Sequence, residues 1–393
     1  MAARRRARSF LDDYTRDLTP ADVQRLFTRD TAEAYRYFTR HADPKAVAAL
    51  PWYRRWPMRL RLVFTGFTMR LSPPRRALYA AGVLAALIGA AILFRGFAPV
   101  RLFLFPFSLT LLLPAWVDGT VWLLVGFVAV NLLILMEVAD RLSLKGELEI
   151  ARDIQLAMLP SGERRVGDTA IAGITRPANT VGGDFYDILN LPDGRVVVAL
   201  GDVAGKGSPA ALLMALLLAM LRTLVDEGLQ SARLIERLNV QVARHSPASR
   251  FITFFYGLYD PNTGVMQFVN AGHLPPLLFR SGGQVERVGL GAHGLALGMF
   301  EHATYAASEV TINPGDVLVL YTDGITEAEN AAGHAFEDSG LVDVVTAQTG
   351  QEPARVGAAI LAAVDRYAGD VRLIDDLTAL VLTRGPRAAP QEG

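Results

Sequence analysis

An uncharged apolar stretch of 18 residues, "ALYAAGVLAALIGAAILF" at 77–94, limits how this chain can fold. As a helix rising about 1.5 Å per residue it would reach roughly 27 Å, close to the thickness of a bilayer's hydrocarbon core. It lies between Arg76 and Arg95, and it begins too late in the chain for a cleavable signal peptide. A buried core helix is the alternative, but the length and the flanking arginines favour a transmembrane span.

A second apolar region, 102–136, follows at once. Two prolines and Asp118 divide it into the uncharged stretches 102–117 and 121–136, each shorter than the roughly 20 residues that a span usually needs. We expect one further span at the end of this region, with the rest interfacial or re-entrant. The sequence therefore predicts a transmembrane region over 77–136 with two spans.

The distribution of charge predicts the orientation of these spans. The 393-residue chain has a formal net charge of zero, yet residues 1–76 carry 17 Lys and Arg against 7 Asp and Glu. By the positive-inside rule this basic region lies in the cytoplasm, and two spans return the chain to the cytoplasm. Capping residues ahead of amphipathic runs indicate that 1–76 is helical, with a basic face that suits lipid contact rather than nucleic acid. We expect a multi-pass membrane protein whose C-terminal part is cytoplasmic.

Residues 137–160 have the pattern of a charged amphipathic linker helix that ends at Pro160. Gln155 interrupts the apolar seam along one face. Two interpretations stay open, a coiled coil that joins two copies in a homodimer and a solvated spacer packed on its own domain. The apolar positions of the seam are Leu144, Leu148, Ala151 and Met158.

Residues 161–385 have the pattern of one large globular domain, followed by a polar, flexible tail at 386–393. Short strand-like runs such as "RVVVAL" and "DVLVLYTD" alternate with glycine turns. Pairs of such runs with short connections predict antiparallel hairpins and an α+β fold rather than a doubly wound parallel sheet. Helical runs are expected at about 208–227, 231–246 and 352–368.

Acidic residues recur at the ends of these predicted strands, each beside glycine or another acid. Clustered carboxylates repel one another unless cations neutralise them. An oxygen-only ligand set in a chain without cysteine suits magnesium or manganese rather than zinc. Two such ions can activate water for attack on a phosphate ester. The acids are Asp184, Asp202, Asp323, Asp375 and Asp376.

Other catalytic patterns fit less well. "GDVAGKG" is not a phosphate-binding P-loop, because Lys206 is followed by Gly207 instead of Ser or Thr. The chain has no cysteine nucleophile, no G-x-S-x-G elbow and no H-E-x-x-H helix. His273 in "NAGH" is more typical of a structural histidine in a hairpin turn, so we leave it outside the catalytic set.

The motifs "ARDIQLAMLP", "VGGDFYD", "GDVAGKGSPAALLMA", "NAGHLPP", "GDVLVLYTDGITEAEN" and "DDLTALVL", in this order, resemble the SpoIIE-like branch of the metal-dependent PPM protein serine/threonine phosphatases. The resemblance covers about 147–384. It implies a sandwich of two antiparallel β-sheets flanked by α-helices, with two Mn²⁺ or Mg²⁺ ions at one end. It also implies phosphoserine or phosphothreonine substrates on small regulatory proteins of the anti-sigma-factor antagonist type.

Carried onto this sequence, the resemblance assigns the metal ligands. Asp184 and Asp202 would bridge the two ions, and Asp323 would complete the catalytic set with them. The main-chain carbonyl of Val203 would bind one ion. The remaining ligands would be Asp375 and Asp376, the second of which takes the place that asparagine often has in the wider family.

The chain departs from the family pattern at two positions. Asn179 stands where the eukaryotic branch has a phosphate-binding arginine, which leaves Lys206 and Arg176 as candidates for that role. Glu337 stands where this branch often has a glycine, which affects a local turn rather than the metals.

The prediction is therefore a membrane-anchored phosphoprotein phosphatase. Two alternatives are weighed against it. "GGDF" resembles the signature of diguanylate cyclases, but a cyclase does not need the distant Asp323 and Asp375. A receptor with an inactive phosphatase-like domain would not need to retain mutually repelling carboxylates.

Overall fold

The computed structural model describes residues 51–93, 97–104, 107–114, 116–246, 250–289 and 293–385. The chain divides into two compact units, one up to Leu142 and one from Ser143 onward. The prediction of a helical region over 1–76 falls largely outside the described residues, as does the predicted tail at 386–393.

The first unit contains two long apolar helices separated by a β-hairpin. Of the region in which we expected interfacial or re-entrant chain, the part before Trp116 forms two paired antiparallel strands, with Phe97 opposite Pro114. The second apolar helix begins after them and continues across the boundary between the units. The elements are α5 (Trp52–Thr68), α6 (Pro73–Leu93), β1 (Phe97–Leu104), β2 (Phe107–Pro114) and α7 (Trp116–Met158).

Helices α6 and α7 approach closely along a seam of glycines. A Cβ added at Gly126 would lie 2.7 Å from the carbonyl oxygen of Gly82, and one added at Gly89 would lie 2.8 Å from that of Gly119. Only hydrogen fits between the two backbones at these points, which is the close packing typical of membrane helices. At one end of the pair, Arg75 forms an ion pair with Asp140 at 2.7 Å. The two helices thus form an antiparallel hairpin.

Among the described residues, three helices are long and apolar enough to cross a membrane. Two are α6 and the apolar part of α7, and the third is α8 (Ser208–Asp226). Helix α8 lies in the second unit, where Met214, Leu217 and Leu218 are completely buried in the protein core. Its apolar composition is therefore explained by packing on a sheet.

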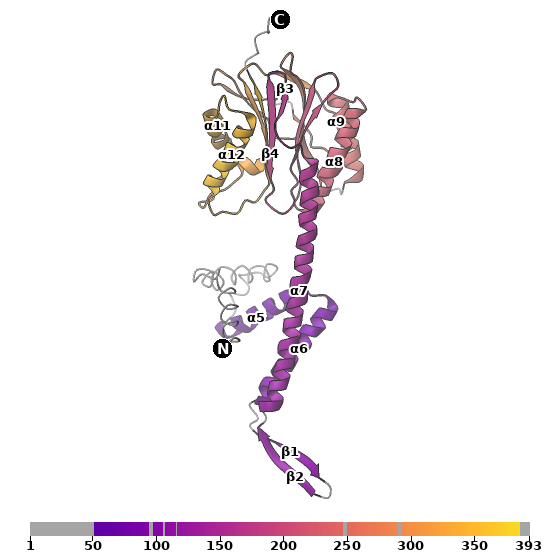
Figure 1. Cartoon of the computed structure of the whole chain (residues 1–393), viewed down its shortest axis with the longest axis vertical. Coiled ribbons are helices and arrows are strands. Elements are labelled where there is room, and N and C mark those ends of the chain that lie inside the picture. Colours follow the sequence, from indigo (N-terminus) through magenta and orange to yellow (C-terminus); the bar gives the residue numbers. More distant parts are fainter. Residues whose placement is uncertain are drawn as a thin grey trace, which may run out of the picture. The chain divides into compact units, whose positions relative to one another are not determined.

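The second unit is a sandwich of two six-stranded sheets, as predicted (Figure 1). One sheet has the strand order β10-β9-β13-β14-β4-β3, and the other has β11-β8-β7-β6-β5 with β12 paired to β8. The pairings are antiparallel except for the two-residue pairing of β11 with β8. The strands are β3 (Arg164–Val166), β4 (Thr169–Arg176), β5 (Phe185–Asn190), β6 (Val196–Val203), β7 (Ile252–Asp260), β8 (Val265–Ala271), β9 (Leu277–Phe279), β10 (Val285–Arg287), β11 (His293–Gly294), β12 (Ser308–Thr311), β13 (Val317–Tyr321) and β14 (Leu377–Arg384).

Helices cover both outer faces of this sandwich (Figure 1). Helices α8 and α9 (Ser231–His245) pack on one sheet, while α11 (Glu337–Ala347) and α12 (Pro353–Ala368) pack on the other. Helices α8, α9 and α12 lie close to the three predicted helical runs, whereas α11 was not predicted. Alternation along β13 separates two cores, since Leu318 and Leu320 belong to one cluster while Val319 belongs to the cluster beneath α12. Both cores lie within the second unit. The short helix α10 spans Asp323–Thr326.

Candidate active site

Antiparallel pairing brings the predicted acids to one end of the sandwich. Asp184 immediately precedes β5, and Asp202 lies near the end of β6, its antiparallel neighbour. In the other sheet, Asp323 follows β13, and Asp375 and Asp376 precede the antiparallel strand β14. The start of one strand and the end of its antiparallel neighbour meet at the same edge, so each sheet contributes acids to a common cluster.

Thr322 links the two halves of this cluster. Its hydroxyl donates a 2.6 Å hydrogen bond to Oδ2 of Asp184, across 138 residues of sequence. Asp184 is buried, and burial raises the pKa of its carboxyl well above the usual range. Repulsion from Asp202 raises this pKa further, whereas the Thr322 hydrogen bond opposes the shift. A cation bound beside Asp184 would relieve this repulsion.

Burial and neighbouring charges also raise the pKa values of the other two central acids, Asp202 and Asp323. Burial, followed by repulsion from Asp323, raises the pKa of Asp202 to about 6. Burial also raises the pKa of Asp323, and the neighbouring Glu327 adds to that shift, while Lys206 lowers it. Glu327 was not singled out from the sequence, although it stands four residues after Asp323 in the same acidic motif.

The two neighbouring aspartates at the start of β14 have different surroundings. Both carboxylate oxygens of Asp376 accept main-chain hydrogen bonds, Oδ1 from Ala178 at 2.8 Å and Oδ2 from Gly183 at 2.7 Å. The side chain of Asp376 thus holds the loop 177–183, which precedes Asp184 and which we call the glycine loop. Asp375 is partly exposed, and its Oδ2 lies 2.8 Å from Nζ of Lys206.

Neither cation considered for phosphate recognition is free of partners. Nζ of Lys206 also donates to the carbonyl oxygen of Ile374 at 2.6 Å. Arg176 forms a bidentate pair with Asp365 on α12, with N–O distances of 2.7 and 2.6 Å. Arg176 is thereby committed to a contact between β4 and α12.

His273, which we left outside the catalytic set, is buried and hydrogen-bonded through both ring nitrogens. The imidazole is buried between the two sheets, where Nε2 donates to the carbonyl oxygen of Tyr321 at 3.1 Å. With Nε2 protonated, Nδ1 accepts a 2.9 Å hydrogen bond from the hydroxyl of Thr253. Burial lowers the pKa of His273 to about 4, so the ring is neutral near pH 7.

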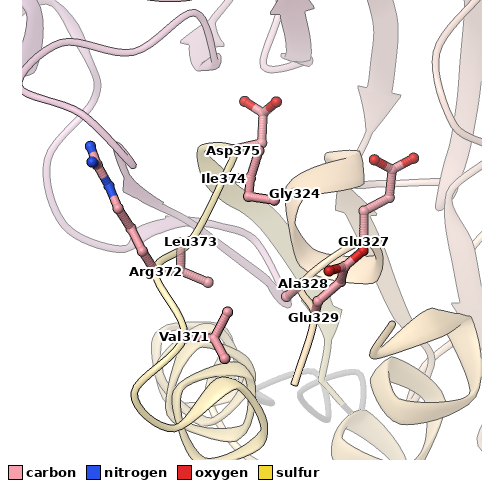
Figure 2. A pocket seen from close by; sticks show the side chains of 9 residues that line it. All are labelled: Gly324, Glu327, Ala328, Glu329, Val371, Arg372, Leu373, Ile374 and Asp375. Atoms are coloured by element: carbon pink, nitrogen blue, oxygen red, sulfur yellow. The ribbon is translucent and has the colours of Figure 1, made fainter. Parts of the chain in front are cut away.

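Two further residues next to the cluster were not identified from the sequence. Gln155, near the end of α7, is buried and hydrogen-bonded to Gly182 of the glycine loop. The interruption of an apolar seam by a buried amide is the signal that could have indicated such a contact. Arg372 lies three residues before Asp375 on the loop that leads into β14, and both residues line the pocket that Figure 2 shows.

The donor chemistry at this end of the sandwich fits divalent cations. In the conformation of the described residues, no three His, Asp or Glu side chains form a ready ligand set for one ion. The available donors are nevertheless all oxygens, which magnesium and manganese prefer. Gly183 leaves space beside two of these donors, since a Cβ there would lie 3.0 Å from the carbonyl oxygen of Val203 and 3.5 Å from Oδ1 of Asp202.

The antiparallel sandwich with outer helices and acids at one end is the fold of the PPM protein phosphatases. Within it, residues 192–385 match the sequence model of the stage II sporulation protein E (SpoIIE) family. The second unit thus contains a SpoIIE-like domain, which confirms the predicted resemblance and fold.

Two curated relatives illustrate this similarity. Protein IcfG of Synechocystis is 30% identical over 245 residues, which is 56% of this chain and 38% of that protein. Phosphoserine phosphatase RsbU of Bacillus subtilis is 29% identical over 243 residues, covering 61% of this chain and 71% of RsbU. The chain therefore spans well under half the length of IcfG and about seven tenths of RsbU.

Solved structures agree on the fold. The RsbU and RsbW domains of Rv1364c from Mycobacterium tuberculosis match with a TM-score of 0.50 and 27% identity, over 57% of this chain and 62% of that chain. The SiaA-PP2C domain of Pseudomonas aeruginosa matches with a TM-score of 0.55 and 22% identity, over 62% of this chain and 98% of that domain. At that identity the second match concerns the fold alone.

Proposed function

We propose that this chain is a membrane-anchored, metal-dependent phosphatase that hydrolyses phosphoserine or phosphothreonine on a regulatory protein of the anti-sigma-factor antagonist type. The observation that carries the proposal is the convergence of Asp184, Asp202, Asp323 and Asp375 from two sheets of a PPM-type sandwich. The similarity to the phosphoserine phosphatases RsbU and RsbP supports the substrate class. The diguanylate-cyclase alternative loses its support, because the acids lie on a different fold.

Each acid has a distinct role in this proposal. Asp184 and Asp202 would bridge two Mn²⁺ or Mg²⁺ ions, with the Val203 carbonyl, Asp323 and Asp375 as further ligands. When bound, such ions supply an activated water for attack at phosphorus and neutralise the phosphate. Thr322 orients Asp184 through its hydrogen bond. We assign Asp376 to positioning the glycine loop, because main-chain amides occupy both of its oxygens.

The membrane anchor is proposed to be the helical hairpin of α6 and α7. The glycine seam and the Arg75–Asp140 ion pair support two antiparallel spans. Two spans place residues 1–76 and the catalytic domain on the same side, and the arginines of 1–76 favour the cytoplasm. Cysteines introduced before α6 and after Pro160 should therefore be labelled from the same face of sealed vesicles. Labelling from opposite faces would contradict the two-span hairpin.

The activity is tested with the whole chain in lipid nanodiscs. Release of phosphate from a phosphoserine peptide should require Mn²⁺ or Mg²⁺ and stop in excess chelator. An Arg237→Glu variant, altered on the exposed face of α9, should retain the metal-dependent rate. Absence of hydrolysis with either metal would favour the inactive receptor, and cyclic dinucleotide formation from GTP would restore the cyclase alternative.

A further inference from the structure

A groove of about 610 Å³ lies beside the acidic cluster, between the end of α7, the loop 177–181 and the start of α8. We call it the arginine groove and define it by Arg152, Asn179, Gly207 and Arg372, which line it together with neighbouring residues. Among the described residues, the only ionisable ones that line it are the two arginines, and none of the lining side chains is acidic. The groove therefore has a positive charge next to a strongly acidic centre.

The two arginines are available to a ligand. Nη2 of Arg372 donates a 3.0 Å hydrogen bond to Oδ1 of Asn179, which orients the guanidinium and leaves its other donors free for further contacts. Both arginine side chains are exposed, and over the described ranges neither forms an ion pair with a carboxylate. This distinguishes them from Lys206 and Arg176, whose charges are compensated by Asp375 and Asp365.

Residues that line the groove are close in sequence to residues of the acidic cluster or to their hydrogen-bond partners. Asn179 follows Ala178, whose amide binds Asp376, and Arg372 lies three residues before Asp375. A molecule in the groove would thus lie next to the reacting phosphate rather than on it. Gly207 at the opposite wall precedes the 19-residue helix α8 and has no side chain to cap the first amides, so the positive end of the helix dipole adds to the field of the arginines.

We propose that the arginine groove binds an acidic segment of the phosphoprotein substrate that flanks the phosphorylated serine or threonine. The inference rests on the phosphatase function proposed above and assigns to it a substrate preference. Guanidinium groups bind carboxylates with paired, directional hydrogen bonds, so the groove selects Asp- or Glu-containing sequences. Its volume is that of a site for several side chains, larger than a phosphate group requires.

The test compares three probes on the whole chain in nanodiscs with Mn²⁺. They are a phosphoserine peptide with aspartates beside the phosphorylated residue, the same peptide with asparagines in their place, and para-nitrophenyl phosphate. In the wild type, kcat/KM for the acidic peptide should exceed that for the neutral peptide, and the difference should shrink as salt is added. In the double variant Arg152→Glu/Arg372→Glu this ratio should fall about tenfold or more, mainly through KM.

An Arg233→Glu/Arg237→Glu variant provides the matched control, because it makes the same change of charge at two exposed arginines on α9 and should keep the wild-type ratio. Equal losses on both peptides and on para-nitrophenyl phosphate would overturn the proposal, since they would place the arginines at the phosphate or the metals. An unchanged ratio in the double variant would overturn it as well. If the wild type hydrolyses none of the probes, the proposed phosphatase function fails instead.

Discussion

The side-chain amide of Gln155 pairs with both main-chain groups of Gly182. Nε2 donates to the carbonyl oxygen of Gly182 at 2.8 Å, and the amide of Gly182 donates to Oε1 at 3.2 Å. Gly182 lies two residues before Asp184, so the last turns of α7 are bonded directly to the loop that carries a proposed metal ligand. Arg222 also binds this end of α7, because its Nη2 donates a 2.6 Å hydrogen bond to the carbonyl oxygen of Met158.

Replacing Gln155 with leucine should weaken metal binding while the fold persists. The substitution leaves two buried main-chain groups of Gly182 without partners, at a cost of about 1–3 kcal/mol that the loop can relieve by moving. If the loop movement weakens metal binding by about 1.4 kcal/mol, the Mn²⁺ concentration for half-maximal activity should rise about tenfold. Asp153→Asn, an exposed change on the same helix, is the control and should leave this concentration unchanged. An unaltered Mn²⁺ requirement in Gln155→Leu would reduce the contact to a packing role.

The buried neutral His273 predicts a dependence of stability on pH. Its pKa is lowered to about 4 in the folded state from 6.5, so the unfolded chain binds more protons in that interval. The contribution of His273 to the free energy of unfolding is therefore complete above about pH 6.5. It falls by about 3 kcal/mol in total as the pH decreases toward about 4. Urea unfolding of the fragment Ser143–Gly393, which contains both cores, should show this slope in the wild type and a smaller slope in His273→Gln. Identical slopes would contradict the assignment.

Glu337 begins α11 with a φ of 60°, in the left-handed region that favours glycine. The family resemblance implies a glycine at this position, and a positive φ is the backbone conformation in which glycine is favoured. Glu337→Gly should therefore stabilise the fragment Ser143–Gly393 by about 1 kcal/mol, because the clash of Cβ with the backbone is removed. The denaturation midpoint in urea reports the change, and Glu337→Ala, which retains Cβ, serves as the control. A glycine variant no more stable than the alanine variant would show that the backbone there is unstrained.

The acids of the candidate site could be predicted from sequence because local signals mark them. Asp184, Asp202, Asp323 and Asp375 each stand beside a strand end and a glycine or second acid, and antiparallel pairing is enough to bring strand ends together. The main-chain contacts of Asp376 could not be predicted, since they involve amides at Ala178 and Gly183, nearly 200 residues away.

Other features of the structure could not be predicted from the sequence, mostly because they depend on contacts between residues far apart in the chain. Gln155 looked like a defect in an apolar seam, and its partner becomes visible only when the glycine loop folds against α7. Arg372 has no local motif, and its approach to Asn179 follows from the pairing of β14 with β4. The β-hairpin of β1 and β2, in the region expected to be interfacial or re-entrant, could not be predicted, because apolar runs of 16 residues or fewer do not distinguish strands from helices.

The most direct test of the proposed metal centre is the binding of Mn²⁺ to the wild-type chain and to Asp202→Asn, measured by calorimetry alongside phosphoserine hydrolysis. Asp202 is the proposed bridge between two ions, so loss of its charge should weaken both sites while circular dichroism stays unchanged. We predict two bound ions per wild-type chain and a fall in kcat/KM of at least about a hundredfold in the variant. Full hydrolysis by the wild type in excess chelator, or wild-type Mn²⁺ binding and turnover in Asp202→Asn, would contradict the account.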